Sequence, residues 1–210
     1  MKKFCVLLAI GSAWFVYAYF HRPITYPPGV LIASDPEQSA IIQKPEPIEH
    51  GRFQLKPLAH FSIEARVLHR KVYGYDRQSA LVPVDLALGW GPMSDQSILD
   101  RLEITQSMRF YWYEYRLPPP LPPAQIVLHS TNLHVIPATK TIGVICKSLR
   151  TGELVHLDGE LVEATGPEIG TWRSSLSRTD TGNGACELML VEECEKLSTV
   201  LERQNALVRR

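Results

Sequence analysis

The side chains best suited to chemistry lie in a short polar block that contains two histidines. His129 and His134 are five residues apart. In a strand, alternation places Ser130, Asn132 and His134 on one face and His129 on the other, so the two imidazoles cannot readily bind one metal ion. Asn132 and His134 could act as a polar pair in a cleft, or His134 could be a hydrogen-bonded structural residue. The sequence therefore predicts no metal site and no cofactor.

A second polar block, residues 172–182, contains Arg173, Ser174 and Asp180. Asp180 begins the triplet Asp-Thr-Gly, which carries the catalytic carboxylate of aspartic proteases, but those enzymes embed it in hydrophobic strands. Here polar residues precede the triplet and Asn183-Gly184 follow it, as in a plain hairpin turn. No nucleophile-elbow pattern surrounds Ser174. An envelope hydrolase with a polar cleft around His134, Arg173 and Asp180 stays open as the alternative function. It requires these side chains to converge with Asn132, Asp95 and Ser174.

Aromatic side chains dominate residues 109–116. A strand there places Tyr111, Tyr113 and Tyr115 on one face and Phe110 and Trp112 on the other. The tyrosine row could stack on sugar rings or grip a peptide. The alternative is a half-buried sheet surface, where aromatics are favoured without any ligand.

The turn Gly89-Trp90-Gly91 precedes a short helix for which Ser94 is the expected N-cap and Asp95 lies in the first turn. Glycine permits backbone conformations that other residues avoid, so Trp90 could stand at an exposed ligand-binding lip. The alternative is that Trp90 fills the core. A loop before a helix N-terminus can bind an anion, but is more often a plain connection.

Alternating apolar residues predict that strands position these side chains. The expected strands are residues 61–68, 108–117, 126–136, 154–164, 171–179 and 185–191, and two short helices follow Ser94 and Thr139. This pattern predicts an α+β fold of mainly antiparallel strands, which could curl into a small barrel, over residues 51–191. Residues 192–210 have the composition of a C-terminal helix.

The N-terminus predicts export. Lys2 and Lys3 precede an uncharged run, residues 4–20, whose 17 residues reach roughly 25 Å as a helix. Residues 1–22 are therefore expected to be a signal anchor, a single transmembrane helix in the inner membrane with the rest of the chain outside the cytoplasm. Val16-Tyr17-Ala18 leaves open a cleaved signal peptide and a soluble periplasmic protein. Six prolines within residues 23–50 predict a semi-extended tether.

Charge and cysteine content limit the partners. The chain has 22 basic and 22 acidic residues, which argues against nucleic-acid binding. Cys146, Cys186 and Cys194 lie on the exported side, where a disulfide could form. Cys186 could reach Cys146 or Cys194, and spacing does not choose between them.

Three blocks resemble an uncharacterised family of bacterial membrane-anchored envelope proteins: residues 85–95 (DLALGWGPMSD), 129–138 (HSTNLHVIPA) and 172–187 (WRSSLSRTDTGNGACE). The resemblance spans most of residues 51–191 and implies a bacterial membrane-linked protein without a known activity. Because no nucleophile, base and orienter are arranged together, the favoured function is non-catalytic. We expect a membrane-anchored binding or assembly module whose partner is an envelope protein or a glycan. Its ligand-binding residues are drawn from the set Trp90, Asp95, Tyr111, Tyr113, Asn132, His134, Arg173 and Asp180.

Overall fold

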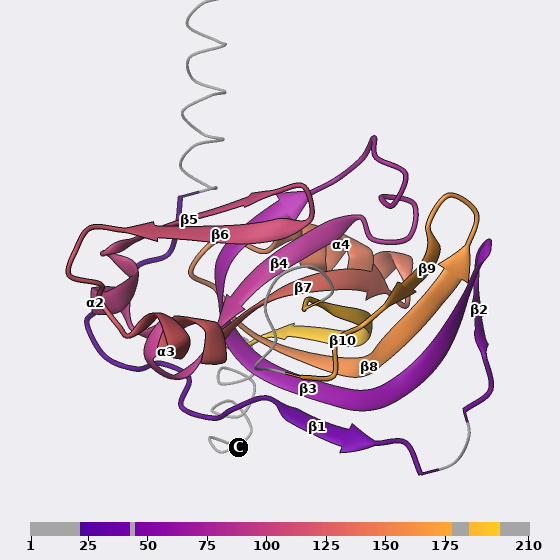
Figure 1. The fold of residues 1–210 in the computed structure, drawn as a ribbon, viewed down its shortest axis with the longest axis horizontal. Coiled ribbons are helices and arrows are strands. Elements are labelled where there is room, and N and C mark those ends of the chain that lie inside the picture. Colours follow the sequence, from indigo (N-terminus) through magenta and orange to yellow (C-terminus); the bar gives the residue numbers. More distant parts are fainter. Residues whose placement is uncertain (1–21, 43–44, 178–184, 198–210) are drawn as a thin grey trace, which may run out of the picture.

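The computed structural model describes residues 22–42, 45–177 and 185–197 (Figure 1). The apolar run of residues 4–20, Asp180 and the Asn183-Gly184 turn lie outside these ranges. No helix of the described ranges is both long and apolar enough to span a bilayer.

Five strands pair in a closed cycle (Figure 1). They are β3 (Phe53–Val72), β4 (Val84–Gly89), β7 (Ser130–Pro137), β10 (Glu187–Lys196) and β8 (Leu154–Gly166). Hydrogen bonding runs β3–β4, β4–β7, β7–β10, β10–β8 and back from β8 to β3. The β7–β10 pair is parallel and the other four pairs are antiparallel. The prediction of an α+β fold with mainly antiparallel strands is therefore confirmed.

Shorter elements surround this cycle. β1 (Glu37–Ala40) and β2 (Ile48–His50) pair with β3, β9 (Gly170–Arg173) pairs with β8, and β5 (Leu102–Ser107) with β6 (Phe110–Tyr115) forms a separate hairpin. The helices are the 3-10 turn η1 (Gly91–Ser94), α2 (Gln96–Leu99), α3 (Pro123–Leu128) and α4 (Lys140–Ser148). Thr139 caps α4 as its side chain accepts from the Ile142 amide, which agrees with the expected helix start.

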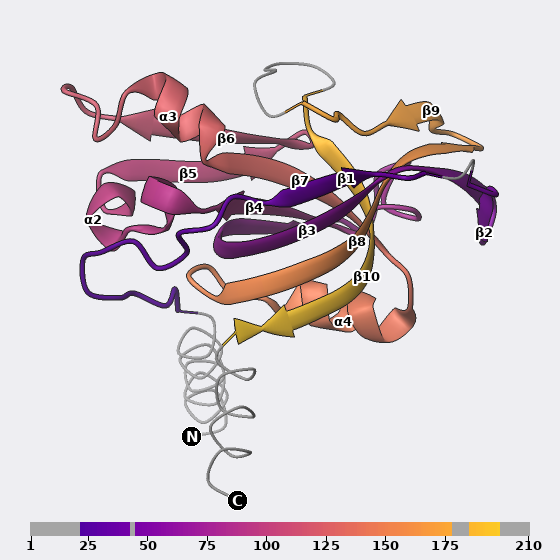
Figure 2. The same cartoon turned by 90° about the horizontal axis from the view of Figure 1, so that it is seen from below.

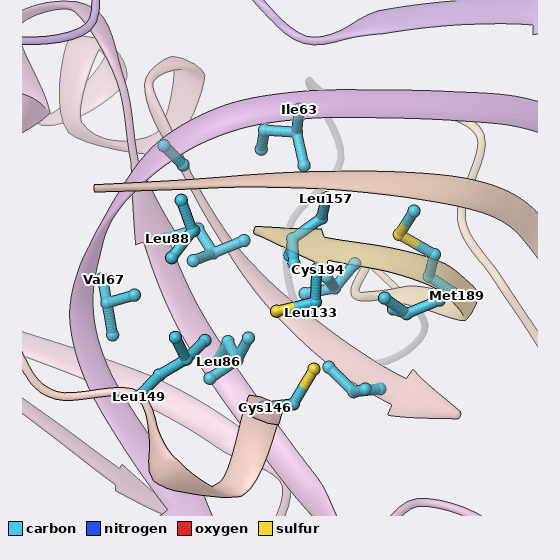
Figure 3. Close-up of a cluster of buried hydrophobic side chains, with 14 of the residues drawn as sticks. Ile63, Val67, Leu86, Leu88, Leu133, Cys146, Leu149, Leu157, Met189 and Cys194 are labelled. Atoms are coloured by element: carbon cyan, nitrogen blue, oxygen red, sulfur yellow. The ribbon is translucent and has the colours of Figure 1, made fainter. Parts of the chain in front are cut away.

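The main core fills the inside of the cycle (Figure 3). Alternate residues of the strands point inward, because successive side chains of a strand face opposite sides. Apolar side chains of α4 and its C-cap, including Cys146 and Leu149, cover the core from one side. The inward residues drawn in Figure 3 include Ile63, Val67, Leu86, Leu88, Leu133, Leu157 and Met189.

Several expected elements have different bounds; for example, the strand expected over residues 61–68 is the longer β3, and the one expected over 108–117 is the shorter β6. The strand expected over residues 126–136 begins only at Ser130, because Pro122 and Pro123 start α3 and His129 ends it. The strand expected over 171–179 ends at Arg173. β10 continues to Lys196, so the first five residues of the segment expected to be a C-terminal helix are strand, and residues 198–210 lie outside the described ranges.

The proline-rich stretch expected to be a tether is fastened to the body of the domain over much of its described length. The Leu31 and Ile32 amides donate to Ser94 Oγ, and the Gly91 amide donates to the Ile32 carbonyl. β1 then adds to β3 as an antiparallel edge strand.

Gly159 lies where β10 carries a bulge between Val191 and Glu193. Its φ is +155°, and a Cβ there would lie 2.0 Å from the Leu190 carbonyl oxygen. Gly170 has a φ of +62°, but a Cβ added there would lie within 4 Å of no described atom. We expect Gly159→Ala to lower the free energy of unfolding by about 3 kcal/mol or more, since backbone strain and a clash add.

The matched control Gly170→Ala should cost only about 1 kcal/mol, because strain acts alone. Denaturant unfolding of the full-length protein measures both values. Equal losses would contradict the close approach of β8 and β10.

Candidate functional site

A buried polar cluster lies on the outer face of β4 and β7. In both strands alternate residues point into the core, so Asp85 of β4 and Asn132 and His134 of β7 point outward. The register places Asp85 opposite His134. All three side chains are nevertheless buried, because the β5–β6 hairpin and neighbouring segments cover this face.

Asp85 is at the centre of the cluster. Its Oδ1 accepts a hydrogen bond from His134 Nδ1 at 2.9 Å and another from Arg109 Nη1 at 3.1 Å. No described atom hydrogen-bonds its Oδ2. The indole of Trp172 covers the imidazole, with ring centroids 4.7 Å apart. A buried carboxylate needs such partners, because removing its charge from water without them is costly.

Arg109 joins the hairpin to the loop between β3 and β4. It donates to the Val82 carbonyl at 2.9 Å and to both Asp76 carboxylate oxygens at 2.7 and 2.8 Å, in addition to Asp85. Its guanidinium lies 3.6 Å from the centroid of the Tyr73 ring. Burial, together with the Asp85 carboxylate, raises the pKa of Tyr73 to about 12.

The backbone at Arg109 is strained. Met108 and Arg109 form the hairpin turn with φ of +50° and +69°, a conformation that favours asparagine and glycine. Non-glycine residues in this region cost about 1–3 kcal/mol and persist only when the surroundings fix them. The four side-chain hydrogen bonds of Arg109 provide that fixation.

A second set of hydrogen bonds ties the underside of the hairpin to β7. Gln106 Nε2 donates to Asn132 Oδ1 at 2.6 Å, and Asn132 Nδ2 donates to the Arg109 carbonyl at 2.9 Å. The hydroxyl groups of Tyr111 and Ser130 lie 2.5 Å apart. Burial raises the pKa of Tyr111 to about 12, so its hydroxyl stays protonated at neutral pH.

The tyrosine row is mainly structural. Tyr111, Tyr113 and Tyr115 pack against a small core that includes Met93 and Ile126, with successive ring centroids 5.9 and 6.3 Å apart. The row therefore does not stand free as a platform for sugar rings. Trp112 points the other way and is 50% exposed.

Trp90 and Asp95 have local roles. Trp90 is 2% exposed and its Nε1 donates to Asp35 at 2.9 Å, so the expectation of an exposed lip is wrong and Trp90 fills the core.

Asp95, rather than Ser94, caps α2. Its Oδ1 accepts from the amides of Gly29 and Ser97, and these hydrogen bonds lower the pKa of its carboxyl.

The residues proposed for a hydrolase do not converge in the described part of the chain. Arg173 is surface-exposed and pairs with Glu163 on the neighbouring strand at 2.7 Å. Ser174 is buried, and its hydroxyl donates to the Ser175 carbonyl and accepts from the Leu188 amide. Neither shares a hydrogen bond with Asn132 or His134, and Asp180 lies outside the described residues. Within the described ranges, no group of His, Cys, Asp and Glu could hold a metal ion.

Sequence reasoning missed Asp76, Asp85, Arg109 and Tyr73. Asp85 had a usable signal, because it is the one charged residue in the apolar strand Val84–Gly89. A charge within such a strand requires a buried partner. That partner, Arg109, lies 24 residues away in the chain and has no local signal.

We expect Arg109→Ala to lower the free energy of unfolding by about 3–5 kcal/mol, because it leaves Asp85 buried with less charge compensation. The matched control is Arg173→Ala, which breaks an exposed pair with Glu163 and should cost less than about 1 kcal/mol. Thermal and denaturant unfolding of the two variants measures the difference. Similar values would show that the Asp85–Arg109 pair does not hold the hairpin.

Comparison of the chain with protein-family models, curated proteins and solved structures finds no match. The resemblance of the three sequence blocks to bacterial envelope proteins therefore stays a prediction, and function has to be argued from the arrangement of side chains.

Proposed function

We propose that this chain is a membrane-anchored binding or assembly module on the exported side of the inner membrane, and that its partner is a protein. The main support is the surface at the tip of the β5–β6 hairpin. Tyr75 is fully exposed and Met108 is 79% exposed, and in the chain they directly precede Asp76 and Arg109, which form an ion pair. With Trp112 we call these residues the tip surface.

The strand order supports a binding role. We infer that the cycle is a small barrel of the OB type, in which five strands pair in the order 1-2-3-5-4 and a helix joins the third strand to the fourth. Here β3, β4, β7, β8 and β10 are these five strands, and α4 is the helix. OB barrels bind ligands on the face of their second and third strands, which corresponds to β4 and β7.

That face is occupied in this chain by its own hairpin. β5 and β6 are inserted between the second and third barrel strands and are held by Arg109, Gln106 and Tyr111. We therefore assign recognition to the outer side of this insertion. A shallow groove of about 510 Å³ follows β6 beside Trp112 and adds a concave element to the tip surface.

The chemistry of the tip surface favours a protein over a glycan or a nucleic acid. Large exposed side chains such as Met, Tyr and Trp are enriched where proteins associate. A row of stacked rings for a glycan would have to come from Tyr111, Tyr113 and Tyr115, which are partly buried against the small core. The balanced charge of the chain lacks the excess of cations that nucleic acids require.

A photoreactive amino acid at position 75 or 112 of the full-length protein in intact cells tests this proposal. We expect a discrete protein adduct from both positions. Position 144 is the control: Val144 is 68% exposed on α4, which lies on the other side of the strand cycle in Figure 2. Met108→Ser should weaken the adduct, because a central apolar contact contributes about 2 kcal/mol at a binding hot spot.

Absence of an adduct at both tip positions would contradict the proposal, as would an equal adduct from position 144. An adduct that is removed by glycosidase and not by protease would identify a glycan instead.

A further inference from the structure

The first described residues are bonded to the body of the domain. The Ile24 amide donates to the Thr151 carbonyl at 2.8 Å, and the Ile24 carbonyl accepts from Arg66 Nη2 at 3.1 Å. Gly152 permits this approach, because a Cβ at that position would lie 1.9 Å from the Ile24 carbonyl oxygen. The chain at residue 24 therefore has a defined place on the surface.

The side chain of Arg66 binds residues 24–26 to the domain. It is 3% exposed, donates to the Ser94 carbonyl at 3.0 Å and also hydrogen-bonds Gln96 Oε1, while its guanidinium lies 5.0 Å from the Tyr26 ring centroid. The Tyr26 amide donates to the same Gln96 oxygen at 3.1 Å. Hydrogen bonds to a buried cation are among the stronger ones, so detaching residues 24–26 would cost Arg66 its bond to the Ile24 carbonyl and its contact with the Tyr26 ring.

Chain length then limits the distance to the membrane. Three residues lie between Phe20, the last of the apolar run, and Ile24, so four steps along the chain join them, and a fully extended chain covers at most about 3.6 Å per step. Thr151 therefore lies within roughly 17 Å of the end of the run, even if the connection is fully stretched. The polar headgroup layer alone is about 5–8 Å thick.

We propose that the surface around Ile24 and residues 150–153 rests on the bilayer that the apolar run enters, with its lipid headgroups as the binding partner. This inference depends on the membrane anchor of the proposed function. It replaces a domain held tens of ångströms away by one that touches the membrane through a specific face.

Charges and chain direction agree with this placement. Arg150 and Lys196 both reach Glu153, at 3.4 and 2.7 Å, and each keeps 35% of its side chain exposed. Together with exposed Arg22, they offer cations to lipid phosphates. In Figure 2 the indigo start of the described chain and the end of β10 lie on the lower side, whereas β6 lies on the upper side. The tip surface would then stay accessible to a partner.

Depth-dependent fluorescence quenching of the full-length protein in lipid vesicles tests this inference. An environment-sensitive fluorescent amino acid is placed at position 151 or, as control, at position 75, and the lipids carry nitroxide groups at the headgroup. We expect quenching at 151 and none at 75. A flexible Gly/Ser linker inserted between Arg22 and Pro23 should abolish the quenching at 151 and leave the fold intact.

Extraction with sodium carbonate separates the two possible failures. A protein that resists extraction but shows no quenching at 151 would overturn the membrane-facing surface and leave the anchor standing. A protein released by carbonate would overturn the anchor itself, and this inference with it.

An independent observation concerns two cysteines. Cys146 of α4 and Cys194 of β10 lie in the same core cluster, and each thiol shifts the pKa of the other, although the two positions are 48 apart in the chain (Figure 3). Cys186, expected to be a member of any pair, lies instead near Asn132 at 3.8 Å. The neighbouring Cys146 thiol, together with Lys196, lowers the pKa of Cys194.

We infer that Cys146 and Cys194 form a disulfide in the exported protein. The Cys194 thiolate attacks an oxidant of the protein-disulfide class, and the Cys146 thiolate then displaces that oxidant from the mixed disulfide. Two thiols lose two protons and two electrons, and the oxidant is reduced to a dithiol. This inference rests on the proposed location, because the cytoplasm keeps thiols reduced.

Peptide mapping of full-length protein from membranes, alkylated before lysis, tests the pair. We expect a peptide linking residues 146 and 194 that survives Cys186→Ser and disappears on reduction or in Cys146→Ser. The folded protein is also oxidised in vitro with a soluble disulfide. Failure to link in vitro would overturn the pairing, whereas linkage in vitro with two alkylated thiols in cells would overturn only the exported location.

Discussion

The buried carboxylate of Asp85 is the constraint on which the outer layer of this protein depends. Its charge is removed from water on the outer face of β4, and its partners come from two different segments: His134 of β7 and Arg109 of the hairpin. Arg109 is in turn held by Asp76 of the preceding loop. Because removing Arg109 or His134 would leave the buried charge of Asp85 with less compensation, the loop, the hairpin and this face of the strand cycle are coupled as one unit.

This coupling explains how a strained turn can carry an exposed surface. Met108 and Arg109 adopt positive φ without glycine, and the buried hydrogen bonds of Arg109 offset that strain. Met108 and Tyr75 therefore lie on a backbone that would lose little conformational entropy when a partner binds. A partner that binds a preorganised surface loses less conformational entropy, so a small apolar area could be sufficient for specific binding.

The sequence predicted four of the five strands of the cycle, β3, β7, β8 and β10 but not β4, because each of the four has an alternating or continuous apolar pattern that can be read locally. It also placed Asn132 and His134 on one face for the same reason. The position of Trp90 was ambiguous, because an indole can fill a core or line a binding site; its burial and its hydrogen bond to Asp35 show that it fills the core. Arg109 could not be found, since its partners Asp76 and Asp85 are 33 and 24 residues away and no local pattern encodes such a contact.

The prolines of residues 23–50 gave the least reliable prediction, because they do not show whether this stretch stands free of the domain or lies on it. They exclude helix and central strand, and therefore indicate an extended chain, but an extended chain can stand free or lie along a surface. Here the chain lies along the surface because of Arg66, a buried cation that needs hydrogen-bond acceptors and donates to the Ile24 and Ser94 carbonyls. In the proposed placement, a burial requirement inside the domain would determine how far the domain can stand from a membrane anchor. The same requirement would orient the hairpin tip away from the membrane, where a partner can reach it.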